Sequence, residues 1–571
     1  MNYRRKILIL LALTIALPAS PVSASPASEV AASERAPNKA AIASAHPLAT
    51  AAGHEILQQG GNAFDAAVAV SAALSVVEPF SSGLGGGGFW LLLRAEDQHS
   101  VVIDGREVAP GQATADMYLD AQGQPVPRAS LDGPLAAGIP GLPAALVHLA
   151  RDYGRVPLAV SLAPAIRLAD QGFPLYARMQ LGLKYKQKLI RQWPAGADLF
   201  LVDGEVPEIG HLIRQPALAR TFEMLATQGR DGFYAGDLAA TMVREVRQAG
   251  GIWALEDLNS YKVVERAPIE FSYQGVRIVS APPPSAGGVA LADMFNILSG
   301  YDLESVDEAT RVHLTVEAMR RAYRDRAEYL GDPDFVSVPV SQLTHPYYAD
   351  GQRASIRRDK ATPSSSLPGY RGDDADGQHT THYSVLDADG NRVAATQTIN
   401  GWFGSGYVIP GTGVLLNNEM DDFAIKPGVQ NLYELVGASA NAIAPGKRPL
   451  SSMSPTFAES DRGVIILGTP GGSRIITMVM LGLMTWMDGG DASEVAARPR
   501  YHHQYLPDHI YYEPDAIAAP VRGSLEAMGH SLRESSRLYG NMNVVTWEFE
   551  TADVDAASDP RAEGGAEVRV Y

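Results

Sequence analysis

The chain has 571 residues, no cysteine and a formal net charge of −17 at pH 7. The lack of cysteine excludes disulfides, thiolate metal sites and a cysteine nucleophile, and it fits an exported protein. A hydrophobic content of 46% supports either one large enzyme fold or several domains. The acidic balance argues against nucleic acid and anionic membrane surfaces as partners.

The first 24 residues have the pattern of an export signal. Basic residues 4–6 precede an apolar run at 7–17, which is too short to span a bilayer, and small residues at 22–24 form a cleavage site. A retained membrane anchor is the alternative. Cleavage after Ala24 removes three positive charges and no acid, which changes the net charge from −17 to −20. We therefore expect a periplasmic or secreted protein that is not bound to a membrane.

The ordered part is predicted to start with helices and a glycine-rich turn. Asn62 is expected to cap a buried helix, with Asp65 completing a capping box. The glycine run at 81–88 precedes an apolar strand at 89–93, whereas a dinucleotide fingerprint lies between a strand and a helix. A strand at 99–104 ends just before Arg106, which either binds a ligand or is simply solvated or ion-paired.

The middle of the chain, 140–343, is predicted to be mostly amphipathic helix, most clearly at 157–172 and 309–330. The charged residues of the second helix are interpreted as a solvated face with intrahelical ion pairs. The segment 355–378 is rich in Arg, Asp, Ser, Pro and Gly, which is typical of an exposed, cleavable junction. Its acidic run 373–377 lacks the remaining ligands of a calcium loop, so no metal is expected there.

A hairpin directly after this junction presents hydroxyl groups. Two strand-like segments, 383–386 and 392–399, flank a turn at 387–391. If Asp387 pairs with Arg392, Thr380 lies opposite Ile399 and between the neighbours of that residue, Thr398 and Asn400. Taken alone, this is most simply a threonine-rich hairpin with satisfied side chains.

Further polar groups follow the hairpin. Acids and amides gather at 417–423, and Ser451 and Ser452 supply adjacent hydroxyls. A Gly471–Gly472 pair between a strand at 464–467 and a helix at 474–487 leaves backbone N–H groups free for an anion or an oxyanion. A phosphate site is the rival interpretation, but the lysine of a P-loop is missing.

Three histidines near the C-terminus raise the question of a metal site: His502, His503 and His509. Adjacent histidines point apart on a helix or a strand, and Pro507 breaks a helix that would stack His502 over His509. They are interpreted as surface residues, and no metal or other cofactor is predicted.

Several long motifs together resemble the gamma-glutamyltranspeptidase family, in particular its bacterial periplasmic members. The motifs are SSGLGGGGFWLL, DGREVAP, TTHYSVLDADGNRVAATQTIN, LLNNEMDDF, GKRPLSSMSPT, GTPGGSRIIT and ASDPR, in this order along the chain. The resemblance implies an α/β N-terminal-nucleophile hydrolase with a four-layer αββα sandwich. It also implies self-cleavage before Thr380, giving a large subunit, 25–379, and a small subunit, 380–571, which associate in one intertwined fold.

The resemblance assigns roles to individual residues. Thr380 would be the nucleophile, supported by Thr398, and the Gly471 and Gly472 amides would form the oxyanion hole. Arg106 with Ser451 and Ser452 would bind the α-carboxylate of the substrate. Asn400 with Glu419 and Asp422 would bind its α-ammonium. Tyr433 would lie in a lid over the pocket. Trp402 departs from the family pattern, in which a smaller or more polar residue is expected, and it bears on the choice of acceptor.

The chemistry implied is transfer of a γ-glutamyl group. A threonine hydroxyl needs a base, and the α-amine of a new N-terminal threonine, with a pKa of about 7.7–8.0, can act as one. The family cleaves γ-glutamyl amides such as glutathione and passes the acyl group to water, an amino acid or a dipeptide. Two alternatives stay open: a cephalosporin or glutaryl acylase of the same fold, and a periplasmic solute-binding protein with an intact chain.

Overall fold

The computed structural model describes residues 36–367 and 380–571. The export signal and the acidic run at 373–377 lie outside these residues. Two antiparallel sheets form the centre, one of seven strands in the order β18-β1-β9-β10-β2-β3-β6 and one of six in the order β17-β16-β12-β11-β8-β7. The strands of the first sheet are β1 (Ala40–Ser44), β2 (Gly87–Arg94), β3 (His99–Gly105), β6 (Val264–Arg266), β9 (Thr381–Leu386), β10 (Arg392–Thr398) and β18 (Gly565–Arg569).

The second sheet stacks on the first. Its strands are β7 (Ile269–Tyr273), β8 (Val276–Ser280), β11 (Thr456–Glu459), β12 (Gly463–Gly468), β16 (Asn543–Glu548) and β17 (Val554–Ser558). The strands β7 and β8, like β6, lie in a stretch that the sequence pattern predicted to be mostly helical. Side chains of β9 and β10 pack against β12 and β16 between the two sheets.

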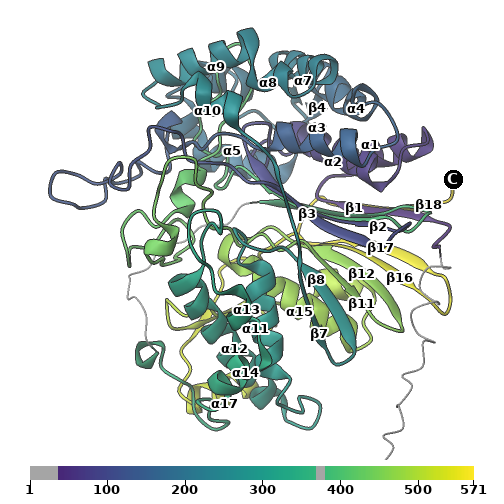
Figure 1. Cartoon of the computed structure of the whole chain (residues 1–571), viewed down its shortest axis with the longest axis vertical. Helices are drawn as coiled ribbons and strands as arrows, with labels where there is room; N and C mark the ends of the chain where they lie inside the picture. Colours follow the sequence, from purple (N-terminus) through teal and green to yellow (C-terminus); the bar gives the residue numbers. More distant parts are fainter. Residues whose placement is uncertain (1–35, 368–379) are drawn as a thin grey trace, which may run out of the picture. The chain divides into compact units, whose positions relative to one another are not determined.

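Helices cover the outer faces, which gives the four layers that the resemblance implied (Figure 1). Over the first sheet lie α1 (Pro47–Gln58), α2 (Ala63–Val77), α3 (Leu142–Asp152), α4 (Leu158–Gln171), α5 (Ala177–Ile190), α7 (Pro216–Gln228) and α9 (Gly236–Gln248). Over the second lie α11 (Gly287–Leu298), α12 (Glu308–Tyr329) and α15 (Ile475–Met487).

The helix α2 begins as the sequence predicted. Asn62 Oδ1 accepts hydrogen bonds from the backbone N–H groups of Phe64 and Asp65, both at 3.0 Å, and Asp65 Oδ2 accepts from Asn62 N–H at 3.0 Å. All fifteen residues of α2 are buried. This is the arrangement expected of a helix that is apolar on all sides.

The charged face predicted for α12 is not solvated. Glu317, Arg320, Arg321, Asp325 and Arg326 are all buried. The intrahelical pairs do form, with Glu317 2.6 Å from Arg321 and 3.5 Å from Arg320. The helix lies under the segment 355–364, whose Thr362 N–H donates to Glu317, so helical periodicity identified the element but not what covers it.

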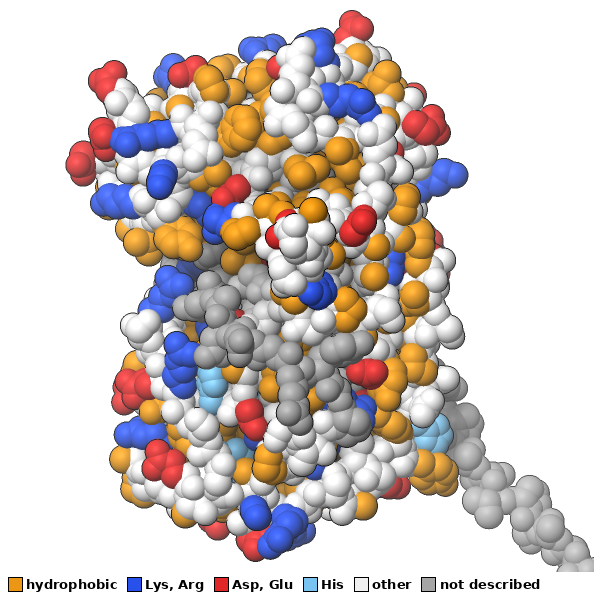
Figure 2. Space-filling model, turned by 90° about the vertical axis from the view of Figure 1, so that its left-hand side faces the viewer, with side chains coloured by type: hydrophobic (Ala, Val, Ile, Leu, Met, Phe, Trp, Pro, Cys, Tyr) orange, Lys and Arg blue, Asp and Glu red, His pale blue; other side chains and the backbone are white. Residues whose placement is uncertain are grey.

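The first sheet combines strands from both sides of residue 380. β9 and β10 lie between β1 and β2, so strands that follow residue 380 are hydrogen-bonded to strands that precede it. No helix of the described residues is long and apolar enough to cross a membrane. On the face drawn in Figure 2, acidic and basic side chains of the described residues are interspersed.

Candidate active site

The threonine hairpin is built on β9 and β10, but its register differs by one residue from the prediction. Arg392 pairs with Leu386 rather than Asp387, and Gln397 pairs with Thr381. Continuing this register places Thr380 opposite Thr398, and their hydroxyls lie 3.3 Å apart. The predicted pairing of Thr380 with Ile399 is therefore wrong.

The turn explains the shift. Asp387 N–H donates to Asn391 O at 3.1 Å, which closes a loop of residues 388–390 with Gly390 at φ +91°. A three-residue loop with glycine in the left-handed region is a common hairpin closure. The Asp387 carboxylate accepts from the N–H groups of Asp389 and Asn391, at 3.0 and 2.9 Å, which stabilises this loop over the four-residue loop, 388–391, that the predicted pairing of Asp387 with Arg392 implied.

The end of β10 is held in an unusual backbone conformation. Asn400 has φ +70°, and its N–H donates to Thr398 Oγ1 at 2.8 Å. Its side-chain amide donates to Asn418 O at 2.9 Å. Because Thr398 Oγ1 accepts from this N–H, its own proton is available to Thr380, so Thr398 can orient the Thr380 hydroxyl.

Gly471 and Gly472 form the turn from β12 into α15, as predicted. Their φ angles are +149° and +57°, and a Cβ on Gly472 would lie 2.2 Å from the Tyr433 ring. Both the backbone conformation and this close approach require glycine at position 472. The short 3₁₀ turn Gly472–Arg474 then leads into α15, and the N–H groups at such a start have no intrahelical partner.

Arg106 directly follows β3 and is fully buried. Its guanidinium forms ion pairs with Glu419 and with Asp422, and lies 3.5 Å from Glu107. Arg106 is thus ion-paired, and the pairing places it beside the acids of segment 417–423, more than 300 residues later in the chain.

Burial and charge shift the acid–base properties of this group. Burial raises the pKa of Glu419 and of Asp422, and Arg106 opposes both shifts. Burial likewise raises the pKa of Glu107 to about 8. Burial acts to lower the pKa of Arg106, but the adjacent carboxylates outweigh it and raise that pKa, so the guanidinium stays charged.

Ten of the eleven predicted site residues line one cavity. Ser452 Oγ and Glu419 Oε2 are buried in its wall without a hydrogen-bond partner, and Tyr433 OH donates to Asn400 O at 2.9 Å across it. The cavity has a volume of about 20 Å³, room for about one water molecule. The ten residues are Arg106, Thr380, Thr398, Asn400, Glu419, Asp422, Tyr433, Ser451, Ser452 and Gly472.

The eleventh residue, Gly471, lines an adjacent cleft with a volume of about 550 Å³. Trp402 forms part of its wall and packs against Phe80, with ring centroids 5.6 Å apart. Gly182 of α5 accommodates the indole, since a Cβ there would lie 2.2 Å from it. The cleft and the cavity lined by Thr380 therefore meet at the Gly471–Gly472 turn.

Comparisons with known proteins agree with this geometry. Residues 49–569 match the family model described as Gamma-glutamyltranspeptidase. The chain is 42% identical over 530 residues to "Glutathione hydrolase proenzyme" of Escherichia coli (strain K12), covering 91% of this chain and 90% of that protein. The chain belongs to the gamma-glutamyltranspeptidase family.

Solved structures support the same assignment. The structure of cephalosporin acylase from Bacillus halodurans aligns with a TM-score of 0.83 and 29% identity, covering 93% of this chain and 95% of that one. Helicobacter pylori gamma-Glutamyltranspeptidase aligns with a TM-score of 0.55 and 40% identity, covering 57% and 93%. The fold is that of an N-terminal-nucleophile hydrolase, and the chain is an enzyme of the gamma-glutamyltranspeptidase family.

One charged residue of this gamma-glutamyltranspeptidase site was not predicted from the sequence. Arg326 of α12 lines the same cavity as Thr380, together with apolar Leu435, Met453 and Ile475. The helical pattern around Arg326 is the one that was interpreted as a solvated face. No signal in the sequence separates Arg326 from the other arginines of α12.

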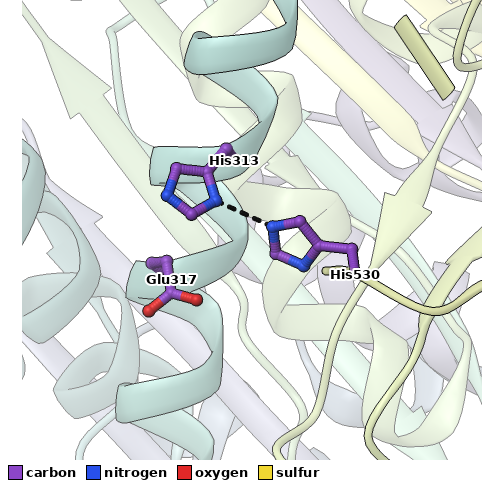
Figure 3. A group of neighbouring side chains, drawn as sticks. All are labelled: His313, Glu317 and His530. Atoms are coloured by element: carbon purple, nitrogen blue, oxygen red, sulfur yellow. Dashed lines mark hydrogen bonds between the residues drawn. The ribbon is translucent and has the colours of Figure 1, made fainter. Parts of the chain in front are cut away.

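One group among the described residues has the spacing of a metal site: His313, Glu317 and His530, with possible ligand atoms within 4.8 Å of one another (Figure 3). His313 Nε2 lies 2.7 Å from Arg357 O, so it carries the proton, and His313 Nδ1 accepts from His530 Nε2 at 2.7 Å. Since Glu317 is ion-paired with two arginines, a cation there would meet adjacent positive charge. We interpret this group as a hydrogen-bonded anchor for the segment 355–364.

The prediction that the C-terminal histidines lie on the surface is wrong for two of them. His502 and His503 are completely buried, and His509 is half-buried. His502 Nδ1 lies 2.8 Å from Thr477 Oγ1 of α15, and His503 Nε2 lies 3.3 Å from Asp508. Burial keeps both rings neutral, since it lowers the pKa of His503 to about 4 and that of His502 well below its ordinary value.

Proposed function

We propose that this protein is a self-processing γ-glutamyl transferase and hydrolase that cleaves the γ-glutamyl amide bond of glutathione and related compounds. The observation that supports it best is one cavity lined both by a hydroxyl pair, Thr380 and Thr398, and by a buried arginine with two carboxylates. Such a cavity matches an amide whose acyl group carries an amino-acid head group.

Cleavage between residues 379 and 380 would free the Thr380 α-amine. The neutral amine takes the hydroxyl proton while Thr380 Oγ1 attacks the γ-carbonyl carbon. The N–H groups of Gly471 and Gly472 stabilise the oxyanion. When the C–N bond breaks, the proton passes to the departing amine and an acyl ester on Thr380 remains. Water or an acceptor amine then attacks the ester and restores the hydroxyl.

The head group of the substrate would be bound by charge. Asp422, Glu419 and Asn400 accept hydrogen bonds from the α-ammonium, and Glu419 Oε2 has no other partner. Arg106, Ser451 and the unpartnered Ser452 Oγ serve the α-carboxylate. Because the cavity holds about one water in this conformation, Tyr433 has to move for the substrate to enter, as a lid does.

Two assays separate the alternatives. A glutaryl acylase cleaves an amide without an ammonium group, so a panel of γ-glutamyl and glutaryl amides, with and without a dipeptide acceptor, tests the donor. We expect γ-glutamyl amides to be preferred because two carboxylates face the ammonium position. A solute-binding protein predicts one intact chain on a denaturing gel. Export to the periplasm or the medium, with residues 1–24 removed, is part of the proposal.

The base should be visible in the pH profile. We expect kcat/KM to rise with pH along a limb between about 5.5 and 8.5, because the Thr380 amine must be neutral to accept a proton. His382 is buried, and burial lowers its pKa to about 3, so it does not titrate in this window. His382→Gln should therefore keep the limb. The measurement uses fully processed wild-type and variant protein. A limb that vanishes in the variant would assign the base role to the imidazole.

The cleft beside Gly471 is suited to the departing or accepting dipeptide. Arg178 lines it half-buried, with its Nε unpartnered. Arg178→Gln is expected to raise the KM for glycylglycine about tenfold, since a hydrogen bond to a charged group contributes about 1.5–3 kcal/mol. Arg537→Gln, at an exposed position of the same cleft, should change it about twofold. Glycylglycinamide, which lacks the carboxylate, is the control acceptor, and an equal effect on both acceptors would contradict the assignment.

A further inference from the structure

Arg326 is a buried arginine in the wall of the catalytic cavity. Its exposed fraction is 5%, and it lines the same cavity as Thr380 and Asp422. Its Nε has no hydrogen-bond partner, and no ion pair reaches its guanidinium from the described part of the chain. A buried charge without a partner is strongly unfavourable, so such a group in a substrate cavity points to a ligand that completes it.

The neighbouring charged groups do not neutralise the Arg326 guanidinium. The groups that act on it are Tyr323 of the same helix, Asp422 and Arg106. Asp422 is already ion-paired with Arg106. Burial lowers the pKa of Arg326 to about 10, so the guanidinium is still protonated at neutral pH. The cavity thus contains one arginine that is neutralised by protein carboxylates and one that is not.

Two further unpartnered atoms indicate which charged groups of a ligand the cavity can bind. Ser452 Oγ is a donor for an anion, and Glu419 Oε2 is an acceptor for a cation. Arg326 adds a positively charged hydrogen-bond donor that can bind the same anion as Ser452. Glu419 and Asp422 already pair with Arg106, whereas Arg326 has no carboxylate partner of its own among the described residues and adds an unneutralised positive charge for an incoming anion.

We propose that Arg326 binds the α-carboxylate of the γ-glutamyl donor, as a second arginine besides Arg106. This rests on the proposed function. Arg326 would place the head group and thereby the scissile amide over Thr380. Its loss should act mainly through KM, because the guanidinium serves the head group and not the reacting carbonyl.

The test compares three anilides that differ only in charged groups: γ-glutamyl, glutaryl, which lacks the ammonium, and 4-aminobutyryl, which lacks the carboxylate. Arg326→Gln is expected to lower kcat/KM at least about 30-fold for the first two, the lower end of what truncating a buried charged pair produces. It should change the third by less than about threefold. Arg326→Lys, which keeps the charge, should recover at least about tenfold relative to Arg326→Gln on the γ-glutamyl anilide.

Arg311→Gln is the matched control, since Arg311 lies in the first turn of the same helix and pairs with Asp488 at 2.6 Å, away from the cavity. It should leave all three anilides unchanged. Equal losses on the three anilides with Arg326→Gln, no loss, or a lysine variant as poor as the glutamine variant would overturn the proposal. Failure of both variants to yield processed protein would assign Arg326 to the architecture. A wild-type enzyme without γ-glutamyl activity would instead refute the proposed function.

Discussion

Thr380→Ala is expected to leave a single uncut chain without activity. The wild-type protein should appear as two fragments, residues 25–379 and 380–571, of 355 and 192 residues. Removing the nucleophile should lower activity by a factor on the order of 10⁴ or more, because the acyl-enzyme cannot form. A denaturing gel, N-terminal sequencing of the smaller fragment and an anilide assay measure the two effects.

The fragments should stay together without a disulfide. β9 and β10 are hydrogen-bonded between β1 and β2, so separating the fragments would break the centre of the first sheet.

Thr381→Ala is the matched control for self-cleavage. Its hydroxyl donates to Glu78 at 2.6 Å, and as the next residue of the strand it faces the opposite side of the sheet. This variant should still be cut. Efficient cleavage of Thr380→Ala would exclude Thr380 as the self-processing nucleophile.

Asp422→Ala should selectively lower kcat/KM for donors that carry an α-ammonium. Truncating one partner of a buried charged pair costs about 2–5 kcal/mol, and the ammonium would lose such a partner. Cleavage of a glutaryl amide should suffer much less, because it has no ammonium. The measurement is kcat/KM for a γ-glutamyl and a glutaryl anilide with the same leaving group.

The neighbouring Asp421 provides the control. Asp421 is buried, its carboxylate accepts from Ser130 Oγ at 2.7 Å and from Leu432 N–H at 2.8 Å, and it does not line the cavity. Asp421→Asn should therefore affect both anilides to the same extent. If Asp422→Ala also lowers the two equally, Asp422 supports the ion pair with Arg106 and not the ammonium.

Local chemistry made several features predictable. Short-range patterns, such as a side chain that caps nearby backbone groups or a regular spacing of apolar residues, predicted four features. These are the capping box at Asn62, the apolar α2, the strand before Arg106 and the glycine turn into α15. The family motifs added a predicted role for each of the site residues. Whether each residue has the role assigned to it stays a prediction that the variants above test.

The hairpin register shows where local reasoning failed. Both candidate turns contain Asp387 and Gly390, and the choice between them depends on the backbone conformation of Gly390 and on the hydrogen bonds that the Asp387 carboxylate accepts. Ala63, at the start of a distant helix, donates one of these at 2.9 Å. A one-residue slip decides which residue faces Thr380, so the Thr380–Thr398 contact was decided only in the folded protein.

The sequence by itself determined the family, and through it the type of chemistry, since several long motifs stand in the family's order along the chain. The tertiary structure alone decided the environment of the charges. Arg106 meets Glu419 and Asp422 across more than 300 residues, and α12 is covered by 355–364 and by residues near 508 and 530. Helical periodicity is the same for a solvated and a buried charged face, because what covers a helix is set by packing between distant segments. For that reason the unpaired Arg326 was visible only in the fold.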